Sequence, residues 1–323
     1  MTAPTLEIHL SDDELTSALR ADARIGLTAD PKWLPPKWFY DARGSELFEQ
    51  ITELPEYYPT RTERALLERV VGEVARTAQA EVLVELGSGS AAKTRLLLSA
   101  LTAGGPLKTY VPQDVSSSAL RVAAAEIAAE FPRLAVHGVV SDFTDTLHNL
   151  PRGGRRMIAF LGGTIGNLVP AERAGFLSSI YEVLEPGERL LLGAGLVIDP
   201  AVLVPAYDDA AGVTAEFNRN VLHVLNNRLD ADFDPDKFAH VASWDTENEW
   251  IEMRLEATED MTVTVRELDL TVRFARGEQM RTEISAKFRI DGLDAELAAA
   301  GFETEQVWTD PDDRFALALA ARR

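Results

Sequence analysis

A glycine-rich turn follows a strongly apolar run of the chain, and its residue types suit the binding of a nucleotide-like cofactor. The run EVLVELGSG (81–89) is typical of a buried parallel strand, and it carries Glu85, Gly87 and Gly89 at its end. Glycines allow a tight turn and let a ligand approach the backbone without a Cβ in the way. Gly87-x-Gly89-x-x-Ala92 also fits a dinucleotide fingerprint, and a plain strand-to-helix turn has the same composition. The turn therefore indicates a cofactor site without choosing the cofactor.

Two acidic residues end the next two predicted strands. Asp114 stands where a carboxylate can accept hydrogen bonds from both hydroxyls of a ribose. Asp142 is followed by Phe143, a pair that suits the exocyclic amine and the face of an adenine. Lys93, in the first helical turn after the glycines, can pair with a cofactor carboxylate. Solvated strand-end acids and a surface lysine are the alternatives, but as a set these residues favour S-adenosylmethionine over a nicotinamide dinucleotide.

The sequence predicts no metal site. The segment DADFDPD (230–236) has the alternating acids of a calcium loop, but Pro235 occupies the glycine position and Val241 the position of the bidentate glutamate. We therefore expect a solvated acidic turn there. The five histidines show no ligand spacing such as HxxxH, and the chain has no cysteine, which excludes thiolate ligands and disulfides.

The elements that must position these residues alternate between strands and helices from residue 61 to 198. Strands are predicted at 81–89, 108–115, 135–143, 157–163 and 189–197, and helices at 92–103, 117–130 and from Pro170 to Leu184. This alternation implies right-handed crossovers and a parallel sheet, whose ligand crevice lies outside the carboxyl ends of the strands.

After residue 198 the pattern changes and then returns. Residues 201–228 are predicted to be helical, 253–274 alternate as antiparallel strands do, and a helix (291–300) and two hairpin-connected strands (303–309, 314–322) close the chain. The fold class is therefore α/β, a seven-stranded Rossmann-like sheet of the kind found in S-adenosylmethionine-dependent methyltransferases. We assign residues 61–198 plus 288–323 to this domain. Residues 1–60 plus 199–287 form a discontinuous α+β substrate-binding domain, because the first 60 residues are too few for a core of their own.

The composition excludes several classes of protein. Of 323 residues, 46% are hydrophobic and 26% charged, which is typical of a folded chain. There are 32 Lys+Arg against 52 Asp+Glu, a net charge of −20 that repels phosphate backbones and anionic lipids. We therefore expect no nucleic-acid partner and no membrane partner. The acidic N-terminus lacks the features of a signal peptide, and the apolar runs are shorter than the ~20 residues that span a bilayer. The sequence predicts a cytoplasmic monomer.

Four further segments carry polar and aromatic residues in predicted loops or at the ends of elements. They are PPKWFYDARGSELFEQITELPEYYPTRTE (35–63), GGTIGNL (162–168), AYDDAAGVTAEFNRNVL (206–222) and TEISAKF (282–288). Together with VELGSG, and over nearly the whole chain, they resemble the histidine-specific Nα-methyltransferases of ergothioneine biosynthesis. The resemblance implies that three methyl groups pass from S-adenosylmethionine to the α-amine of L-histidine, giving trimethylhistidine (hercynine).

The resemblance also implies roles for individual residues. It assigns cofactor binding to Gly87, Lys93, Asp114, Asp142 and Phe143. It assigns substrate binding to Tyr57, Asn167, Tyr207, Glu283, Ser285, Met253 and Phe217, and catalytic roles to Asn167 and Tyr40. In this scheme Asn167 orients the substrate amine, while the aromatic faces of Tyr40 and Phe217 surround the growing ammonium.

The remaining implied contacts concern the two ends of the substrate. Glu283 and Ser285 are two residues apart on an extended segment, so both can point to one side and reach an imidazole nitrogen. Tyr57 and Tyr207 can bind the α-carboxylate through their hydroxyls, without a cation. The substrate ammonium must lose a proton before transfer, and because no lysine or histidine is an evident base, we expect the proton to pass to water in a dry site.

The chain departs from the family pattern at three places. Gly163 stands where a serine is usual, Ala286 replaces a cysteine, and the fifth strand ends in GAGLVID where a Thr-Asp pair is common. Three other functions remain open at this point: a methyltransferase for another aromatic amino acid, a nicotinamide-dependent oxidoreductase, and an amino-acid-binding module without catalysis.

Overall fold

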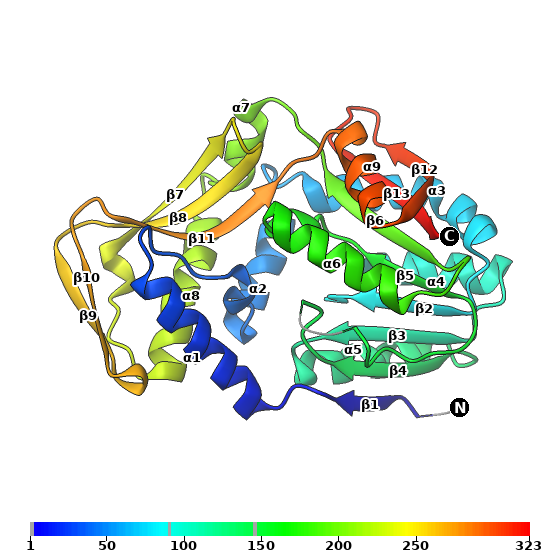
Figure 1. Ribbon diagram of the computed structural model, residues 1–323, viewed down its shortest axis with the longest axis horizontal. Helices are drawn as coiled ribbons and strands as arrows, with labels where there is room; N and C mark the ends of the chain where they lie inside the picture. The colour runs from blue at the N-terminus through cyan, green and yellow to red at the C-terminus, as the bar shows by residue number, and fades with distance from the viewer. Residues whose placement is uncertain (1–2, 90–91, 145–146) are drawn as a thin grey trace. The chain divides into compact units, whose positions relative to one another are not determined.

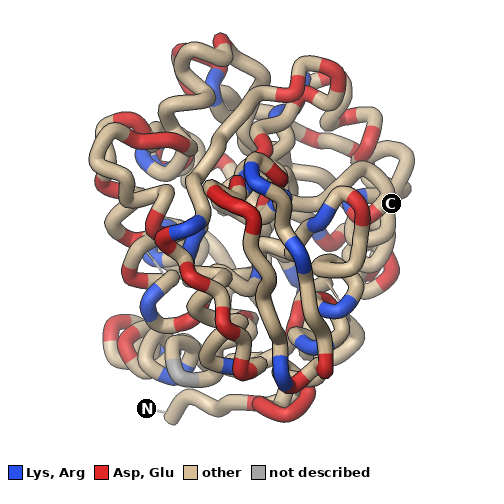
Figure 2. The backbone as a smooth tube through the Cα atoms, turned by 90° about the vertical axis from the view of Figure 1, so that its left-hand side faces the viewer, with Lys and Arg blue, Asp and Glu red and all other residues tan. Residues whose placement is uncertain are grey.

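The computed structural model describes residues 3–89, 92–144 and 147–323, and its chain divides into two compact units. The first unit comprises Met1–Ser11, Arg61–Leu196 and Phe288–Arg323, and the second comprises Asp12–Thr60 and Val197–Lys287. Acidic and basic residues are both spread along the chain rather than gathered in one segment (Figure 2). None of the helices in the described ranges has both the length and the hydropathy needed to cross a membrane.

The first unit is built on one eight-stranded sheet with the order β1-β4-β3-β2-β5-β6-β13-β12 (Figure 1). The strands are β1 (Thr5–Ile8), β2 (Val82–Leu86), β3 (Thr109–Asp114), β4 (Ala135–Val140), β5 (Arg156–Phe160), β6 (Arg189–Gly195), β12 (Phe302–Thr309) and β13 (Phe315–Arg322). The strands from β1 to β6 pair in parallel, whereas β13 is antiparallel to both β6 and β12. The seven strands other than β1 form the predicted seven-stranded sheet, with the closing hairpin at its edge, and β1 adds an eighth strand.

The strand β1 corrects the prediction for the N-terminus. We expected the first 60 residues to pack on the segment 199–287, but residues 1–11 belong to the first unit. There β1 pairs in parallel with β4, from Thr5 opposite His137 to Ile8 opposite Val140. The physical reason is that β4 would otherwise leave a row of backbone groups unpaired at the sheet edge.

Helices cover both faces of this sheet. They are α3 (Pro59–Ala78), α4 (Ala92–Gly104), α5 (Ser117–Glu130), α6 (Pro170–Val183) and α9 (Ile290–Ala299). Met157 and Ala159 of β5 share one core with apolar residues of α3, α4 and α5. Phe160 points to the opposite face, because side chains alternate along a strand, and its ring lies 4.8 Å from that of Phe176 on α6. On that face Arg173 of α6 bonds Glu296 of α9 at 2.8 and 2.9 Å.

The second unit combines helices with two small antiparallel sheets. Its helices are α1 (Asp12–Thr28), α2 (Ala42–Thr52), α7 (Pro200–Leu203) and α8 (Val213–Leu229), with short 3₁₀ turns η1 (Pro36–Phe39), η3 (Val204–Ala206), η4 (Pro235–Lys237) and η5 (Arg266–Leu268). One sheet has the order β11-β8-β7, and the other pairs β10 with β9. The strands are β7 (Phe238–Asp245), β8 (Trp250–Ala257), β9 (Met261–Val265), β10 (Leu270–Phe274) and β11 (Gln279–Ala286).

The prediction of a helix over residues 201–228 was wrong for residues 207–212. The short helix α7 and the turn η3 end at Ala206, and α8 begins only at Val213. Pro205 lies within η3, and Gly212 has φ +76° before α8, a left-handed conformation that glycine adopts readily. Residues 207–212 therefore form a non-helical connection between η3 and α8, and Tyr207 is its first residue.

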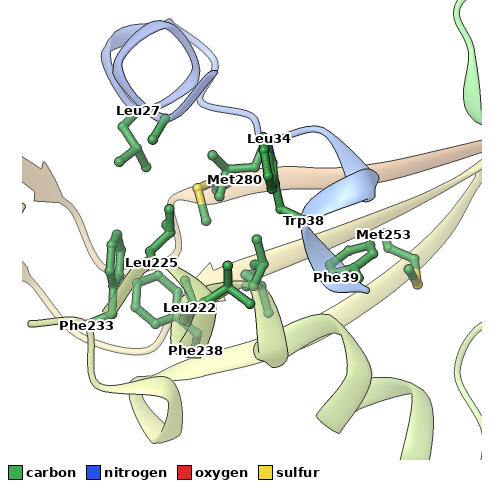
Figure 3. Close-up of a cluster of buried hydrophobic side chains, with 14 of the residues drawn as sticks. Leu27, Leu34, Trp38, Phe39, Leu222, Leu225, Phe233, Phe238, Met253 and Met280 are labelled. Carbon is green, nitrogen blue, oxygen red and sulfur yellow. The ribbon is translucent and has the colours of Figure 1, made fainter. Parts of the chain in front are cut away.

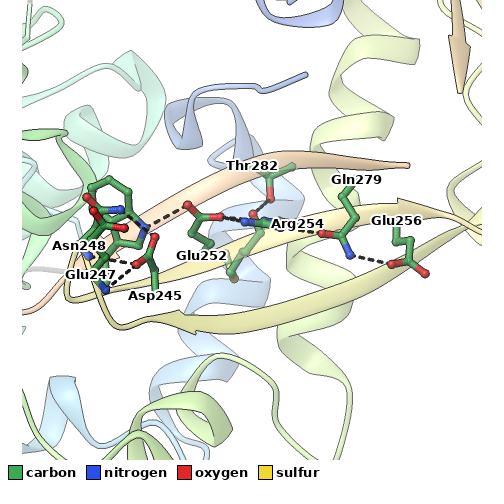
Figure 4. A network of polar contacts seen from close by, with 10 residues as sticks. Asp245, Glu247, Asn248, Glu252, Arg254, Glu256, Gln279 and Thr282 are labelled. Carbon is green, nitrogen blue, oxygen red and sulfur yellow. Dashed lines mark hydrogen bonds and ion pairs between the residues drawn. The ribbon is translucent and has the colours of Figure 1, made fainter. Parts of the chain in front are cut away.

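The apolar core of the second unit lies between α8, residues 12–60 and one face of its sheets (Figure 3). Ile251, Met253 and Leu255 of β8 belong to this core. The intervening residues of β8 carry a polar network on the other face, shown in Figure 4. There the carboxylate of Glu252 accepts from the indole N–H of Trp250 at 3.0 Å and from Nε of Arg254 at 2.7 Å. The two faces of β8 are thus chemically distinct.

Candidate active site

The cofactor candidates of the first unit follow the carboxyl ends of adjacent strands. After β2, Gly87 and Gly89 have φ of +67° and +46°, where residues with a Cβ are strained. The N–H of Gly87 donates to the carbonyl of Gln113 at 2.9 Å, which ties the turn to β3. A Cβ placed on Gly87 would lie 3.8 Å from the ring of Phe143. Ser90, the last residue of the predicted turn, lies outside the described residues.

Asp114 ends β3 with its carboxylate turned toward the same turn. Its Oδ1 accepts from the N–H of Ser116 at 3.0 Å, and the N–H groups of Gly89 and Val115 also bond it. Burial raises the pKa of the Asp114 carboxyl, and these three bonds lower it in part. A carboxylate has about four acceptor positions, so Asp114 can hold the turn and still accept from a ligand.

Asp142 and Phe143 follow β4. The Asp142 Oδ1 accepts from the N–H and the hydroxyl of Thr144 at 2.9 and 2.6 Å. The Phe143 ring lies 5.2 Å from that of Phe160 and 5.7 Å from that of Phe176. These contacts fix the direction of the Phe143 ring beside the glycine turn.

The side chain of Glu85 points into the protein interior, where it bonds other side chains of the first unit. Its buried carboxylate accepts from the hydroxyls of Thr94 and Tyr110, both at 2.6 Å, and burial raises the pKa of the Glu85 carboxyl. It therefore joins β2 to α4 and β3 behind the glycine turn.

Sequence reasoning missed Glu63, a carboxylate with no exposed surface near the ends of β5 and β6. Its two oxygens accept from the N–H of Gly162 at 2.7 and 3.0 Å, and Lys93 donates to it as well. A Cβ on Gly193 would lie 2.3 Å from Oε1 of Glu63, so this glycine makes room for the carboxylate. The GAG sequence of the fifth strand thus lacks an acid of its own, and α3 supplies one beside it.

Asn167 lies at the end of the 3₁₀ turn η2 (Thr164–Asn167), which follows β5. Gly162 and Gly163 precede the turn with φ of +84° and +69°. The N–H of Gly166 donates to the carbonyl of Gly163 at 2.9 Å. The left-handed conformation of Gly163 explains why a glycine fits where a serine was expected.

The second unit gathers aromatic rings from its N-terminal segment, from α8 and from Tyr207, which follows η3. Ring centroids lie 5.4 Å apart for Tyr40 and Phe217, and 6.1 Å apart for Tyr57 and Tyr207. Phe48, which the sequence did not single out, connects these pairs, because its ring lies 5.6 Å from Tyr40, 5.9 Å from Phe217 and 6.2 Å from Tyr57. The predicted aromatic residues of this unit therefore form one continuous cluster.

The backbone on either side of Tyr40 is held by α8. The side-chain amide of Asn220 donates to the carbonyl of Phe39 at 3.0 Å and to Oδ1 of Asp41 at 2.7 Å. Asp41 in turn caps α2 by accepting from the N–H of Gly44 at 2.8 Å. Tyr40 remains 41% exposed, while the protein atoms around it raise the pKa of its hydroxyl.

A β-bulge turns the polar residues of β11 toward this cluster. Arg281 pairs with Arg254, but Glu283 already pairs with Met253, so Thr282 is the extra residue. Met253 lies on the core face of β8, and the bulge therefore places Glu283 and Ser285 on that face instead of the outer one. The Thr282 hydroxyl donates to the carbonyl of Met253 at 3.0 Å and to the Asn218 side chain at 2.6 Å.

Electrostatics shows which tyrosines lie near Glu283. Burial raises the pKa values of Tyr57 and Tyr207, and surrounding protein atoms raise that of the partly exposed Tyr40; the charge of the Glu283 carboxylate adds to the rise in each. The hydroxyl of Tyr207 also makes a 2.8 Å hydrogen bond with that of Ser285. The second unit thus brings together every substrate candidate that the sequence placed within it.

His240 on β7 holds the backbone of Tyr207. Its Nε2 lies 2.8 Å from the Tyr207 carbonyl and its Nδ1 lies 2.8 Å from the amide nitrogen of Asn218. A carbonyl only accepts and an amide nitrogen only donates, so the ring carries its proton on Nε2 and is neutral. Burial is the main cause that lowers the pKa of His240.

Lys287 is the other residue that the sequence did not foresee. Its buried ammonium donates to the hydroxyls of Tyr207 and Ser285. The segment TEISAKF indicated an extended strand, but nothing in the sequence showed that a lysine at its end turns inward. Burial is the main cause that lowers the pKa of Lys287.

The acidic segment 230–236 takes part in backbone contacts. Asp232 Oδ1 accepts from the backbone N–H of Thr264 at 2.6 Å, and the Arg266 guanidinium forms an exposed ion pair with Oδ1 of Asp230 at 3.3 Å. Within the described parts of the chain there is no group of three or more histidines, cysteines, aspartates or glutamates that could hold a metal ion.

Comparisons with known proteins extend over both units. A family model described as "Histidine-specific methyltransferase, SAM-dependent" matches residues 19–322. The Histidine N-alpha-methyltransferase of Mycolicibacterium smegmatis is 54% identical over 318 residues, 98% of this chain and 99% of that protein. Ergothioneine biosynthesis protein 1 of Neurospora crassa is 34% identical over 226 residues, 68% of this chain and 25% of that protein. A solved S-adenosylmethionine-dependent methyltransferase from Clostridium acetobutylicum has 12% identity and a TM-score of 0.48, covering 86% of this chain and 98% of that one.

Proposed function

The chain belongs to the family of S-adenosylmethionine-dependent, histidine-specific methyltransferases, and we propose that it methylates the α-amine of L-histidine three times, giving hercynine for ergothioneine biosynthesis. The observation that carries this proposal is the 54% identity to the Mycolicibacterium smegmatis enzyme, which covers both units. The likeness to the Neurospora crassa ergothioneine protein supports the pathway. A cytoplasmic location and a monomeric state belong to the same proposal, and cell fractionation and light scattering test them.

In this proposal the first unit binds S-adenosylmethionine, which supplies an electrophilic methyl group when bound. The residues present fit such a ligand, because Gly87 lacks a Cβ beside the Phe143 ring and Asp114 keeps acceptor capacity at the end of β3. Asp114 would accept from the ribose hydroxyls, and Asp142 with Phe143 would hold the adenine. Lys93 would act at the carboxylate end of the cofactor while its ammonium stays paired with Glu63.

The second unit supplies the groups that would recognise histidine. Glu283 and Ser285 lie on one face of β11 and can take up the imidazole nitrogens, with Met253 beside them on β8. Tyr57 and Tyr207 would donate to the α-carboxylate. A site that pairs the polar atoms of a ring rejects analogues without them by up to ~10⁴–10⁵, because its own buried groups are left unpaired.

The reaction requires a neutral amine whose lone pair is aligned with the methyl group. We propose that Asn167 orients this amine, so that positioning supplies much of the rate. The amine loses its proton to water, because a dry site disfavours the charged form. The product is a quaternary ammonium, which the faces of Tyr40 and Phe217 can stabilise by cation–π attraction.

A substrate panel tests the proposal. The protein is incubated with S-adenosylmethionine and single amino acids, and methyl increments are counted by mass spectrometry. We expect three increments on histidine, faster reaction of its partly methylated forms than of phenylalanine or leucine, and no product without the cofactor. Preferred methylation of tryptophan or tyrosine would establish the alternative, a sister enzyme for another aromatic amino acid, and would overturn the assignment to histidine.

A further inference from the structure

Lys287 forms a closed triangle with two hydroxyls of the second unit. Its Nζ lies 2.8 Å from Oη of Tyr207 and 2.7 Å from Oγ of Ser285, and the two oxygens are 2.8 Å apart. Nζ also lies 4.9 Å from the centroid of the Tyr207 ring. The residue is only 7% exposed, so its ammonium is largely removed from bulk water. A buried cation is costly unless hydrogen bonds and a counter-charge compensate it, and such a residue needs an explanation.

The hydrogens of the triangle define what it can bind. An ammonium only donates, so both hydroxyls accept from Lys287. The single contact between the hydroxyls uses the proton of one of them. The other hydroxyl must then direct its O–H to an acceptor outside the triangle. The triangle therefore presents an O–H donor with a positive charge behind it, an arrangement that suits an anion.

The surroundings of the triangle separate the two ends of an amino-acid substrate. Burial lowers the pKa of Lys287 and the charge of the Glu283 carboxylate raises it, and Glu283 lies on β11 two residues before Ser285. The carboxylate of Glu283 would repel a second anion near it, whereas the ammonium of Lys287 attracts one. The negative and positive groups of this cluster thus favour one orientation of a bound amino acid. Its N–H-bearing ring would lie toward Glu283, and its carboxylate would lie toward the triangle.

We propose that Lys287 is a positioning residue that supplies, through the hydroxyls of Tyr207 and Ser285, the counter-charge for the α-carboxylate of the substrate. This inference rests on the proposed function, which makes the substrate an amino acid. It differs from the expectation that tyrosine hydroxyls bind the carboxylate without a cation, because it places Lys287 behind them. It also gives Ser285 a second task, because its hydroxyl orders the triangle as well as the ring.

The test compares two ligands in two proteins. Histidine and histamine share the imidazole and the amine, but only histidine has the carboxylate. Both are titrated calorimetrically into enzyme saturated with S-adenosylhomocysteine, for the wild type and for Lys287→Met, which keeps the length of the side chain without its charge. We expect Lys287→Met to weaken histidine about 10- to 100-fold, the range of a hydrogen bond to a charged group, and to change histamine less than about threefold.

Kinetics and control variants separate positioning from structural damage. KM for histidine should rise by the same factor as the dissociation constant while kcat stays within a few-fold, and Lys287→Arg should restore part of the loss. Lys237→Met removes an exposed lysine paired with Glu259 in the same unit, and should leave both ligands unchanged. Tyr207→Phe, which deletes the hydroxyl between Lys287 and the ligand, should reproduce the carboxylate-specific loss even if Lys287→Met does not fold.

Two results would overturn the inference: equal weakening of histidine and histamine in these variants, or no weakening of histidine. Failure of the proposed function looks different, because wild-type enzyme would then not methylate histidine at all. In that case the same comparison is made with the amino acid that is methylated and its decarboxylated amine, and Lys287 is judged on that pair.

Discussion

Replacing Glu63 by glutamine tests whether its buried carboxylate organises the strand ends of the first unit. The glutamine keeps the shape and one oxygen for the N–H of Gly162, but it faces the ammonium of Lys93 without a charge. Removing one partner of a buried ion pair costs roughly 3–5 kcal/mol. Lys93 keeps 23% of its side chain exposed, and water there offsets part of the loss. We therefore expect Glu63→Gln to lower the free energy of unfolding by about 2–4 kcal/mol.

Urea denaturation followed by circular dichroism measures this change against a matched control. Glu68→Gln alters the same helix, α3, where Glu68 forms an exposed pair with Arg64 at 3.0 Å. That variant should change the free energy of unfolding by no more than about 0.5 kcal/mol. Adding Lys93→Met to Glu63→Gln should recover part of the loss, because it removes the uncompensated charge. Equal stability of the Glu63→Gln and Glu68→Gln variants would refute the reasoning.

Four further predictions concern ligands and pH. Lys93→Met should weaken S-adenosylhomocysteine but not methylthioadenosine, which lacks the amino-acid end; calorimetry showing equal weakening of both would mean that Lys93 does not act at the cofactor carboxylate. The pKa of His240 is lowered by burial, so the unfolded chain takes up its proton first as the pH falls below 6.5, and the free energy of unfolding should decline there. The decline should be shallower in His240→Gln, and an unchanged slope in urea titrations at several pH values would contradict this. Glu283→Ala should reduce kcat/KM for histidine about 10- to 100-fold with unchanged affinity for S-adenosylhomocysteine, whereas wild-type turnover would show that the carboxylate does not contact the imidazole. Activity should be the same with and without EDTA, and loss that added divalent cations restore would reveal a metal site.

The elements of the first unit were predictable where local sequence and tertiary packing agree. The helix α5 has the predicted bounds, because an alanine-rich segment follows Ser116, whose side chain caps it by accepting from Ala119. The strand β1 was not predicted, because Thr5–Ile8 is short and mostly exposed and becomes a strand only through pairing with β4. Its structure depends on a partner about 130 residues away, which no local pattern reports.

The sequence was sufficient to predict several residues of the candidate site, but not which charged residues are buried next to them. The glycines of the first turn could be predicted, because the left-handed backbone conformation there favours glycine. Asp114 could be predicted from its position at the end of a strand. No local sequence pattern indicates that a charged side chain is buried. Glu63 lies on a helix that looks solvated along one side, and Lys287 follows a strand, so each is ordinary until its neighbours are known. Which roles the predicted site residues play stays a prediction that the variants above test.

The bulge in β11 makes the number of residues in that strand as important as their identity. Substitution of Thr282 would change two hydrogen bonds, and its deletion would remove the bulge but keep Glu283 opposite Met253. One residue inserted after Thr282, by contrast, would shift all later residues by one pairing position. Ile284 would then point inward, while Glu283 and Ser285 would meet the polar network around Glu252 and Arg254. A one-residue insertion here is therefore far more severe than a point change. Efforts to alter the substrate should vary side chains at a constant strand length, and relatives with a different specificity can be compared in this segment only after the bulge has been aligned.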